Sequence, residues 1–68
     1  MHRLWRLRKQ HLFVDAQISD EGDAGVEIAY LYNHELSYTR RWPSRDAALA
    51  DADAKRAELE REGWMLHW

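Results

Sequence analysis

Four histidines are the side chains of this sequence best suited to acid–base or metal chemistry: His2, His11, His34 and His67. No two of them have the short spacing on one helix or strand that metal ligands usually need. His34 and Glu35 are adjacent, but they fall at the tip of an expected hairpin, where no pocket excludes water. The sequence also lacks a glycine-rich phosphate loop, a Gly-x-Ser-x-Gly elbow and a His-Glu-x-x-His motif. We therefore expect no enzymatic activity, no cofactor, no metal site and no small-molecule substrate.

Recognition of a partner is the other chemistry that the residue types offer. In the expected strands, some apolar and basic side chains alternate with core positions and share the outer side of a sheet. The predicted partner-binding residues are Leu4, Arg6, Arg8, Phe13, Leu31 and Arg41. Asp15, Glu27 and Glu35 are expected on the same side, where their carboxylates would repel phosphate groups. A protein partner, or a second copy of the chain in a homodimer, is therefore favoured over nucleic acid.

Four segments have the composition and alternation of β-strands: residues 4–8, 12–19, 26–32 and 36–42. In the second segment, apolar side chains occupy every other position from Leu12 to Ile18. Asn33 and His34 stand where a tight turn is needed, and asparagine tolerates the left-handed backbone conformation. Because short polar connections make successive strands antiparallel neighbours, we expect a meander over about residues 3–42.

A helix is expected over about residues 45–62, where strong helix formers dominate. Ser44 suits the N-cap position, and Gly63 suits the position just after the helix. The inward-facing arc of this helix is lined by small or aliphatic residues, namely Ala48, Leu49, Ala52 and Leu59. Residues 63–68 form an aromatic tail, which we expect to pack over the core rather than to add a fifth strand.

These elements predict a single α+β domain over residues 1–68: a four-stranded antiparallel meander, one C-terminal helix packed on one sheet face, and a short aromatic tail (ββββα). The expected inner sheet face carries large side chains from every strand: Trp5, Leu7, Leu12, Val14, Ala16, Ile18, Val26, Ile28, Tyr30, Tyr32, Leu36, Tyr38 and Trp42. A helix about 10 Å across cannot cover four strands, which span roughly 19 Å. Either the tail, through Trp64, Leu66 and Trp68, or a second copy must cover the remainder.

Composition narrows the class of protein further. The 68 residues include 46% hydrophobic and 32% charged residues, with 10 basic and 12 acidic side chains and a net charge of −2. This balance is typical of a folded domain and argues against strong nonspecific binding to nucleic acid. The chain has no cysteine, which excludes a disulfide framework, and four tryptophans, which enlarge a small core. No apolar window of about 18 residues and no secretory signal is visible, so we expect a cytoplasmic protein without a membrane span.

The C-terminal part carries a recognisable pattern: RRWPSRDAAL at residues 40–49, KRAEL at 55–59 and GW at 63–64. This pattern resembles the C-terminal half of many short uncharacterised bacterial proteins. In those proteins an aromatic strand end, a serine cap, a helix rich in Ala, Glu and Arg, and Gly-Trp follow a small antiparallel sheet. The resemblance implies a bacterial origin and a compact sheet-plus-helix domain, and it implies no activity.

The first functional hypothesis is therefore a small non-enzymatic protein–protein interaction domain, either a homodimer or bound to another protein, that uses a surplus apolar sheet face or an unpaired strand edge. One alternative is a nucleic-acid-binding accessory module that reads through the sheet face with Arg6, Arg8 and Arg41. Another is a small phage- or plasmid-type inhibitor that docks on a larger host protein.

Overall fold

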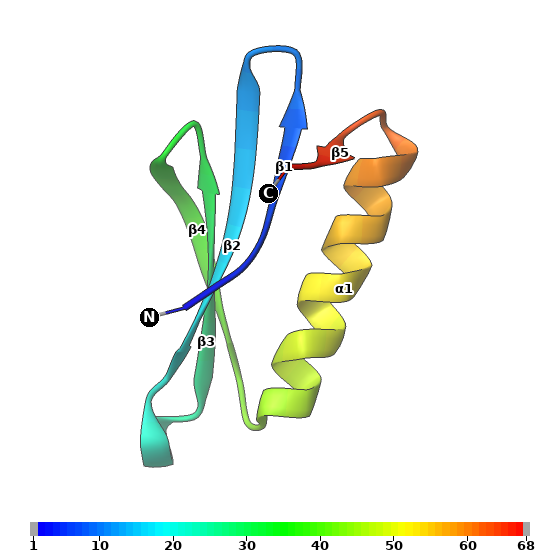
Figure 1. Cartoon of the computed structure of the whole chain (residues 1–68). Helices are drawn as coiled ribbons and strands as arrows, with labels where there is room; N and C mark the ends of the chain where they lie inside the picture. The colour runs from blue at the N-terminus through cyan, green and yellow to red at the C-terminus, as the bar shows by residue number, and fades with distance from the viewer. Residues whose placement is uncertain (1, 68) are drawn as a thin grey trace.

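A five-stranded antiparallel sheet and one C-terminal helix make up the computed structural model, which describes residues 2–67 (Figure 1). The elements in chain order are β1 (His2–Lys9), β2 (Leu12–Asp20), the 3₁₀ turn η1 (Gly22–Ala24), β3 (Val26–Tyr32), β4 (Glu35–Trp42), α1 (Arg45–Arg61) and β5 (Met65–Leu66). The strand order is β4-β3-β2-β1-β5. The expected α+β class, with an antiparallel sheet followed by a helix, is confirmed. The sheet has five strands where four were expected.

The turn between β3 and β4 is set by two residues with positive φ. Asn33 has φ +51° and His34 has φ +71°, and Tyr32 faces Glu35 across the turn. A two-residue loop with both φ values positive matches the twist of the strands that it joins. The side-chain oxygen of Asn33 also accepts a hydrogen bond of 2.9 Å from the backbone N–H of Phe13, which ties the turn to β2.

Both ends of α1 are capped by groups that the sequence places there. The Ser44 hydroxyl accepts a hydrogen bond of 3.2 Å from the backbone N–H of Ala47. At the other end, the N–H of Gly63 donates to the carbonyl of Glu60, and the N–H of Trp64 donates to that of Leu59. This pair of bonds is a Schellman motif, which reverses the chain and brings Trp64 back beside Leu59. The helix ends at Arg61, one residue before the expected limit.

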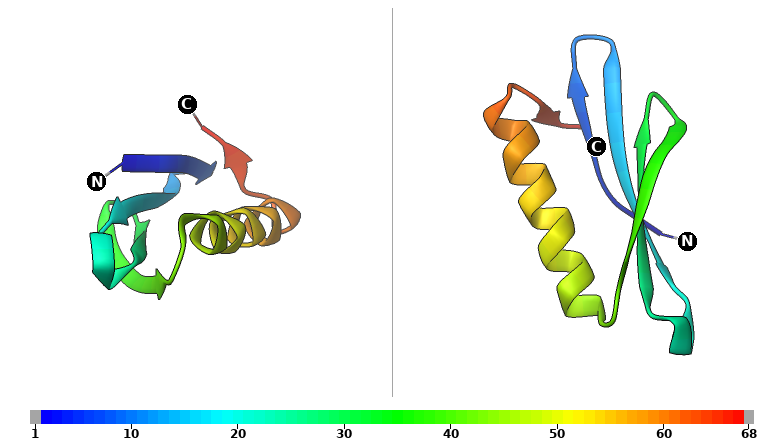
Figure 2. Two further views of the ribbon diagram at one scale, coloured as in Figure 1. Left: turned by 90° about the horizontal axis from the view of Figure 1, so that it is seen from below. Right: turned by 180° about the vertical axis from the view of Figure 1, so that it is seen from behind.

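The core lies between α1 and one face of the sheet, which we call the inner face (Figure 2). Its fully buried members come mainly from the central strands and include Leu7, Ala16, Ile28 and Tyr30. On the helix side, Ala48 and Ala52 are buried, so small side chains let the helix approach closely. The expected inward arc of the helix is therefore confirmed. No helix in the described part of the chain has the length and apolar character needed to cross a membrane.

Two β-bulges change which side chains share a face. In β1 the register shifts between Arg3 and Trp5, so that Leu4 packs against the buried core rather than standing on the outer face as expected. In β4 the shift falls beside Ser37 and puts Leu36 opposite Leu31 on the outer face. Leu36 was expected inside, but it is 63% exposed. A bulge inserts one residue into a strand, so simple alternation fails on one side of it.

The aromatic tail packs against the core and also pairs with β1 as a short strand. Trp64 is buried in the core, as expected for a packed tail. Met65 and Leu66 then form β5, which faces Arg8 and Leu7 of β1. Leu66 faces the fully buried Leu7 and is itself 44% exposed, and Trp68 lies outside the described residues.

Candidate functional site

The outer face of the sheet is the place where sequence reasoning put the partner-binding residues. The register brings Arg6 opposite Asp15, Asp15 opposite Leu31, and Arg8 opposite Phe13. Four of the six predicted residues are therefore neighbours: Arg6, Arg8, Phe13 and Leu31. The other two stand apart, because Leu4 turns to the core and Arg41 lies opposite Glu27, farther along the sheet.

The Arg6 side chain is already engaged by the protein's own carboxylate. Its Nε and Nη2 atoms donate to the two oxygens of Asp15 at 2.7 and 2.8 Å, and its guanidinium lies 5.7 Å from the centre of the Phe13 ring. Asp15 is only 4% exposed, whereas about a quarter of the Arg6 side chain remains exposed, so this bidentate pair is partly buried. The hydrogen bond to Asp15 raises the pKa of Arg6. Arg6 thus neutralises a buried acid.

The other two predicted arginines also have internal partners. Arg41 contacts the Glu27 carboxylate at 3.0 Å and donates to the carbonyl of Ala24 at 3.2 Å. Arg8 donates through Nε to the carbonyl of Gln10 at 2.8 Å. These contacts leave less of the basic surface available for phosphate groups.

Two of the histidines gather around Phe13, which sequence reasoning did not foresee. The ring of His34, from the β3–β4 turn, lies 5.9 Å from that of Phe13, and His67, from the tail, lies 5.4 Å away. Both histidines are brought beside Phe13 by contacts between segments far apart in the sequence, which no local sequence pattern indicates. Among residues 2–67, no three His, Cys, Asp or Glu side chains are grouped so as to hold a metal ion.

Strand β4 forms one edge of the sheet and is the most exposed of the four long strands. Seven of its eight residues are exposed, and only Trp42 is partly buried. The helix begins just after β4 but slants across the sheet, so that its far end lies near β5 on the opposite side (Figures 1 and 2). A hydrogen bond of 2.9 Å from Lys9 Nζ to the carbonyl of Glu62 anchors that far end to β1. The half of β4 next to the β3–β4 turn is therefore not covered by the helix.

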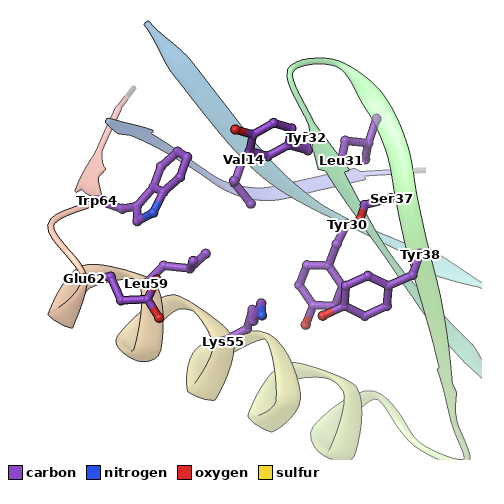
Figure 3. Close-up of a pocket in the computed structure, with 10 residues that line it drawn as sticks. All are labelled: Val14, Tyr30, Leu31, Tyr32, Ser37, Tyr38, Lys55, Leu59, Glu62 and Trp64. Atoms are coloured by element: carbon purple, nitrogen blue, oxygen red, sulfur yellow. The ribbon is translucent and has the colours of Figure 1, made fainter. Parts of the chain in front are cut away.

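An open groove of about 240 Å³ lies where the helix diverges from the β3–β4 hairpin (Figure 3). Tyr32 and Tyr38 line its sheet side, and Lys55, Leu59 and Glu62 line its helix side. Trp64 closes one end, with its ring 6.4 Å from that of Tyr32 in an edge-on arrangement. The volume corresponds to about eight water molecules of the liquid, enough for a large apolar side chain.

The floor of the groove is held by a polar contact between sheet and helix. Tyr30 donates through its hydroxyl to Asp51 at 2.9 Å, and Arg40 approaches the same carboxylate at 3.4 Å. Burial, and then this hydrogen bond, raises the pKa of Tyr30. The centre of its ring lies 5.0 Å from that of Tyr38 in a tilted arrangement, and Tyr38 is 40% exposed. The groove is thus preformed by aromatic rings with restricted freedom, as ligand-binding clefts usually are.

The alternation of the strands predicts Tyr32 and Tyr38 in the core, whereas both line the open groove. The signal that could have found it was the excess of large side chains over what one alanine-rich helix can cover. Trp64 takes up part of that excess, and the two tyrosines show where the remainder stays open.

Comparisons of the chain with protein-family models, with curated proteins and with solved structures gave no match.

Proposed function

We propose that the chain is a small non-enzymatic protein–protein interaction domain, whose binding site is the free edge of β4 together with the adjoining groove. The observation that carries this proposal is the pairing of two features at one place. An edge strand exposed along its length runs beside an open cleft walled by Tyr32, Tyr38 and Trp64.

The mode of binding that fits this site is addition of an extended segment to the sheet. The outer N–H and C=O groups of an edge strand can pair with a strand from another chain, which supplies affinity. Alternate side chains of that strand would point to the inner side, where the groove can accept one large apolar or aromatic residue. The exposed rings of Tyr32 and Tyr38 suit such a contact, because aromatic residues lose little side-chain entropy on binding.

Because Arg6 and Arg41 form ion pairs within the chain, a protein is better supported as the partner than nucleic acid. Arg6 and Arg41 would have to leave Asp15 and Glu27 before they could contact phosphates, and the net charge of −2 adds to the repulsion. The predicted outer-face set, around Phe13, is held mainly by contacts within the chain. The edge of β4 therefore replaces it as the proposed binding surface.

Site-specific photo-crosslinking tests this proposal. A photoreactive amino acid replaces Thr39 on β4 in one variant and Glu58 on the helix in a second, because both positions are exposed. We expect protein adducts from position 39 in living cells and few from position 58, with loss of the first set when Tyr38→Glu is added. Equal adduct yields from the two positions would contradict a specific site on β4.

A further inference from the structure

We infer that the partner at this site is a second copy of the chain, whose β4 pairs antiparallel with β4 of the first across a two-fold axis near Tyr38. This inference rests on the proposed function and names the partner of the same site. The pairing would join two five-stranded sheets into one continuous sheet and place a new strand beside each groove.

The two edges of the sheet differ in how far they are open. On one side, β5 pairs with Leu7 and Arg8 of β1, and the N–H of His67 donates to the carbonyl of Arg6. On the other side, the eight residues of β4 have β3 as their neighbour and, within residues 2–67, no strand beyond it. At about 3.4 Å per residue, this free edge is roughly 27 Å long, with one bulge at Ser37. It is therefore the longer of the two templates for strand addition.

The charges along β4 are complementary to those of an antiparallel copy. The strand begins with Glu35 and ends with Arg40 and Arg41 before Trp42. Antiparallel self-pairing brings the acidic start of each copy beside the basic end of the other, whereas parallel pairing would put like charges together. Both arginines touch acids of their own chain, yet their side chains remain about half exposed and can bridge to a second carboxylate.

Exposed apolar side chains stand on both faces of the hairpin where the two copies would meet. Tyr32 and Tyr38 lie on its inner face and Leu36 on its outer face, and they are three of the five large hydrophobic residues that stand exposed in the described chain. Tyr38 lies near the middle of β4, so a two-fold axis there puts the two Tyr38 side chains next to each other, each in contact with the Tyr30 ring of its own chain. An isologous contact of this kind uses the same patch on both copies and closes on itself.

Size also favours a second copy as the occupant. A domain of about 60 residues buries only about 60% of its unfolded surface, and oligomerisation is one of the few ways to add to that without disulfides. The chain has no cysteine, and its helix leaves the groove open. A dimer would bury the aromatic surface that the single helix does not reach.

A single-cysteine experiment tests the geometry directly, because the natural chain contains none. Across a two-fold axis at Tyr38, opposed Cα atoms lie about 4.5–5.5 Å apart, within the range of a disulfide. We expect Tyr38→Cys to form a covalent dimer under mild oxidation at micromolar concentration. Glu58→Cys, a control at another exposed position on α1, should form at least tenfold less. Equal yields for the two variants would overturn the two-fold pairing.

Sedimentation equilibrium is the second test, because it measures the mass of the chain in solution. We expect the unmodified chain to sediment at twice 8.2 kDa at micromolar concentration. Glu35→Arg should raise the dissociation constant at least tenfold at low salt and less at high salt, because it places like charges at each end of the pairing. This variant leaves the core intact, and circular dichroism would show that its fold is retained.

The outcomes separate this inference from the proposed function. A chain that stays at 8.2 kDa and yet crosslinks through position 39 to other proteins overturns the second copy and keeps the interaction site. A chain that stays at 8.2 kDa and forms no adduct through position 39 overturns both. A dimer that Glu35→Arg does not weaken overturns the pairing through β4.

Discussion

The hydroxyl of Tyr30 and the carboxylate of Asp51 meet at 2.9 Å and join the middle of β3 to the middle of α1. This bond crosses the core at the point where the helix begins to diverge from the sheet. On one side of it, small residues such as Ala48 pack closely, and on the other side the groove opens. The pair thus marks the boundary between the closed core and the proposed binding site.

Replacing Tyr30 by Phe tests the contribution of this bond. We expect a loss of about 1.5–3 kcal/mol in the free energy of unfolding near neutral pH, because the ring is kept and one hydrogen bond to a carboxylate is removed. Urea unfolding measures it. Tyr32→Phe, at a half-exposed ring that lines the groove, is the control and should change the stability by less than about 0.5 kcal/mol.

Alkaline pH should reduce the difference between the wild type and Tyr30→Phe. The pKa of Tyr30 is raised in the folded state above its ordinary value of 10, so the unfolded chain loses this proton first as the pH rises. The contribution of Tyr30 is therefore complete below about pH 10 and is lost above it, by up to about 1.4 kcal/mol per pH unit. Parallel stability curves for the two proteins from pH 9 to 11 would contradict the raised pKa.

Removing Arg6 from the Arg6–Asp15 pair should destabilise the fold more than removing Asp15. Arg6→Ala leaves a buried carboxylate without its bidentate partner, and we expect a loss of about 2–3 kcal/mol. Asp15→Ala frees a guanidinium that can turn into water, so its loss should be nearer about 1 kcal/mol. The double variant, measured by urea unfolding, should cost less than the sum. Additive losses would show that the pair is not coupled.

Local signals were sufficient for most of the fold. Alternation and turn residues located the four long strands, and the Ser44 cap and Gly63 located the ends of α1 within one residue. The bulge beside Ser37 and the one at Leu4 were not foreseen, because either register is compatible with the local alternation. Their positions are decided by how β3 and β2 face these strands, which is a long-range property.

The candidate site was less predictable than the fold. Arg6 and Asp15 were both placed on the outer face, but their mutual neutralisation depends on the register between β1 and β2. The uncovered aromatic surface was foreseen as an imbalance, whereas its location depends on the slant of α1. At the far end of the slanted helix, Lys9 Nζ donates to the carbonyl of Glu62 and Trp64 is buried in the core, and both contacts are long-range.

Gly25 should be the least replaceable glycine in the chain. Its φ is +98°, and a Cβ there would stand 2.6 Å from the backbone oxygen of Trp42 at the end of β4. We expect Gly25→Ala to cost about 3 kcal/mol in unfolding free energy, since it combines an unfavourable backbone conformation with a clash against main chain. Gly22→Ala, at φ +63° with nothing within 4 Å of the added Cβ, is the matched control and should cost about 1 kcal/mol. Equal losses would show that the approach to Trp42 relaxes freely.

Trp64 should contribute far more to the free energy of unfolding than its neighbour Met65, although both belong to the tail. Trp64 is buried against Leu59 and closes the groove, whereas Met65 is 72% exposed. We expect Trp64→Ala to cost about 3–5 kcal/mol and to release β5 from Leu7 and Arg8, because the Schellman turn loses the apolar contact that holds it. Met65→Ala should stay within about 0.5 kcal/mol. Urea unfolding gives both free energies, and amide hydrogen exchange at His67, whose N–H donates to the carbonyl of Arg6, reports the pairing with β1. If Trp64→Ala leaves exchange at His67 unchanged, the strand pairing rather than the buried indole holds the tail in place.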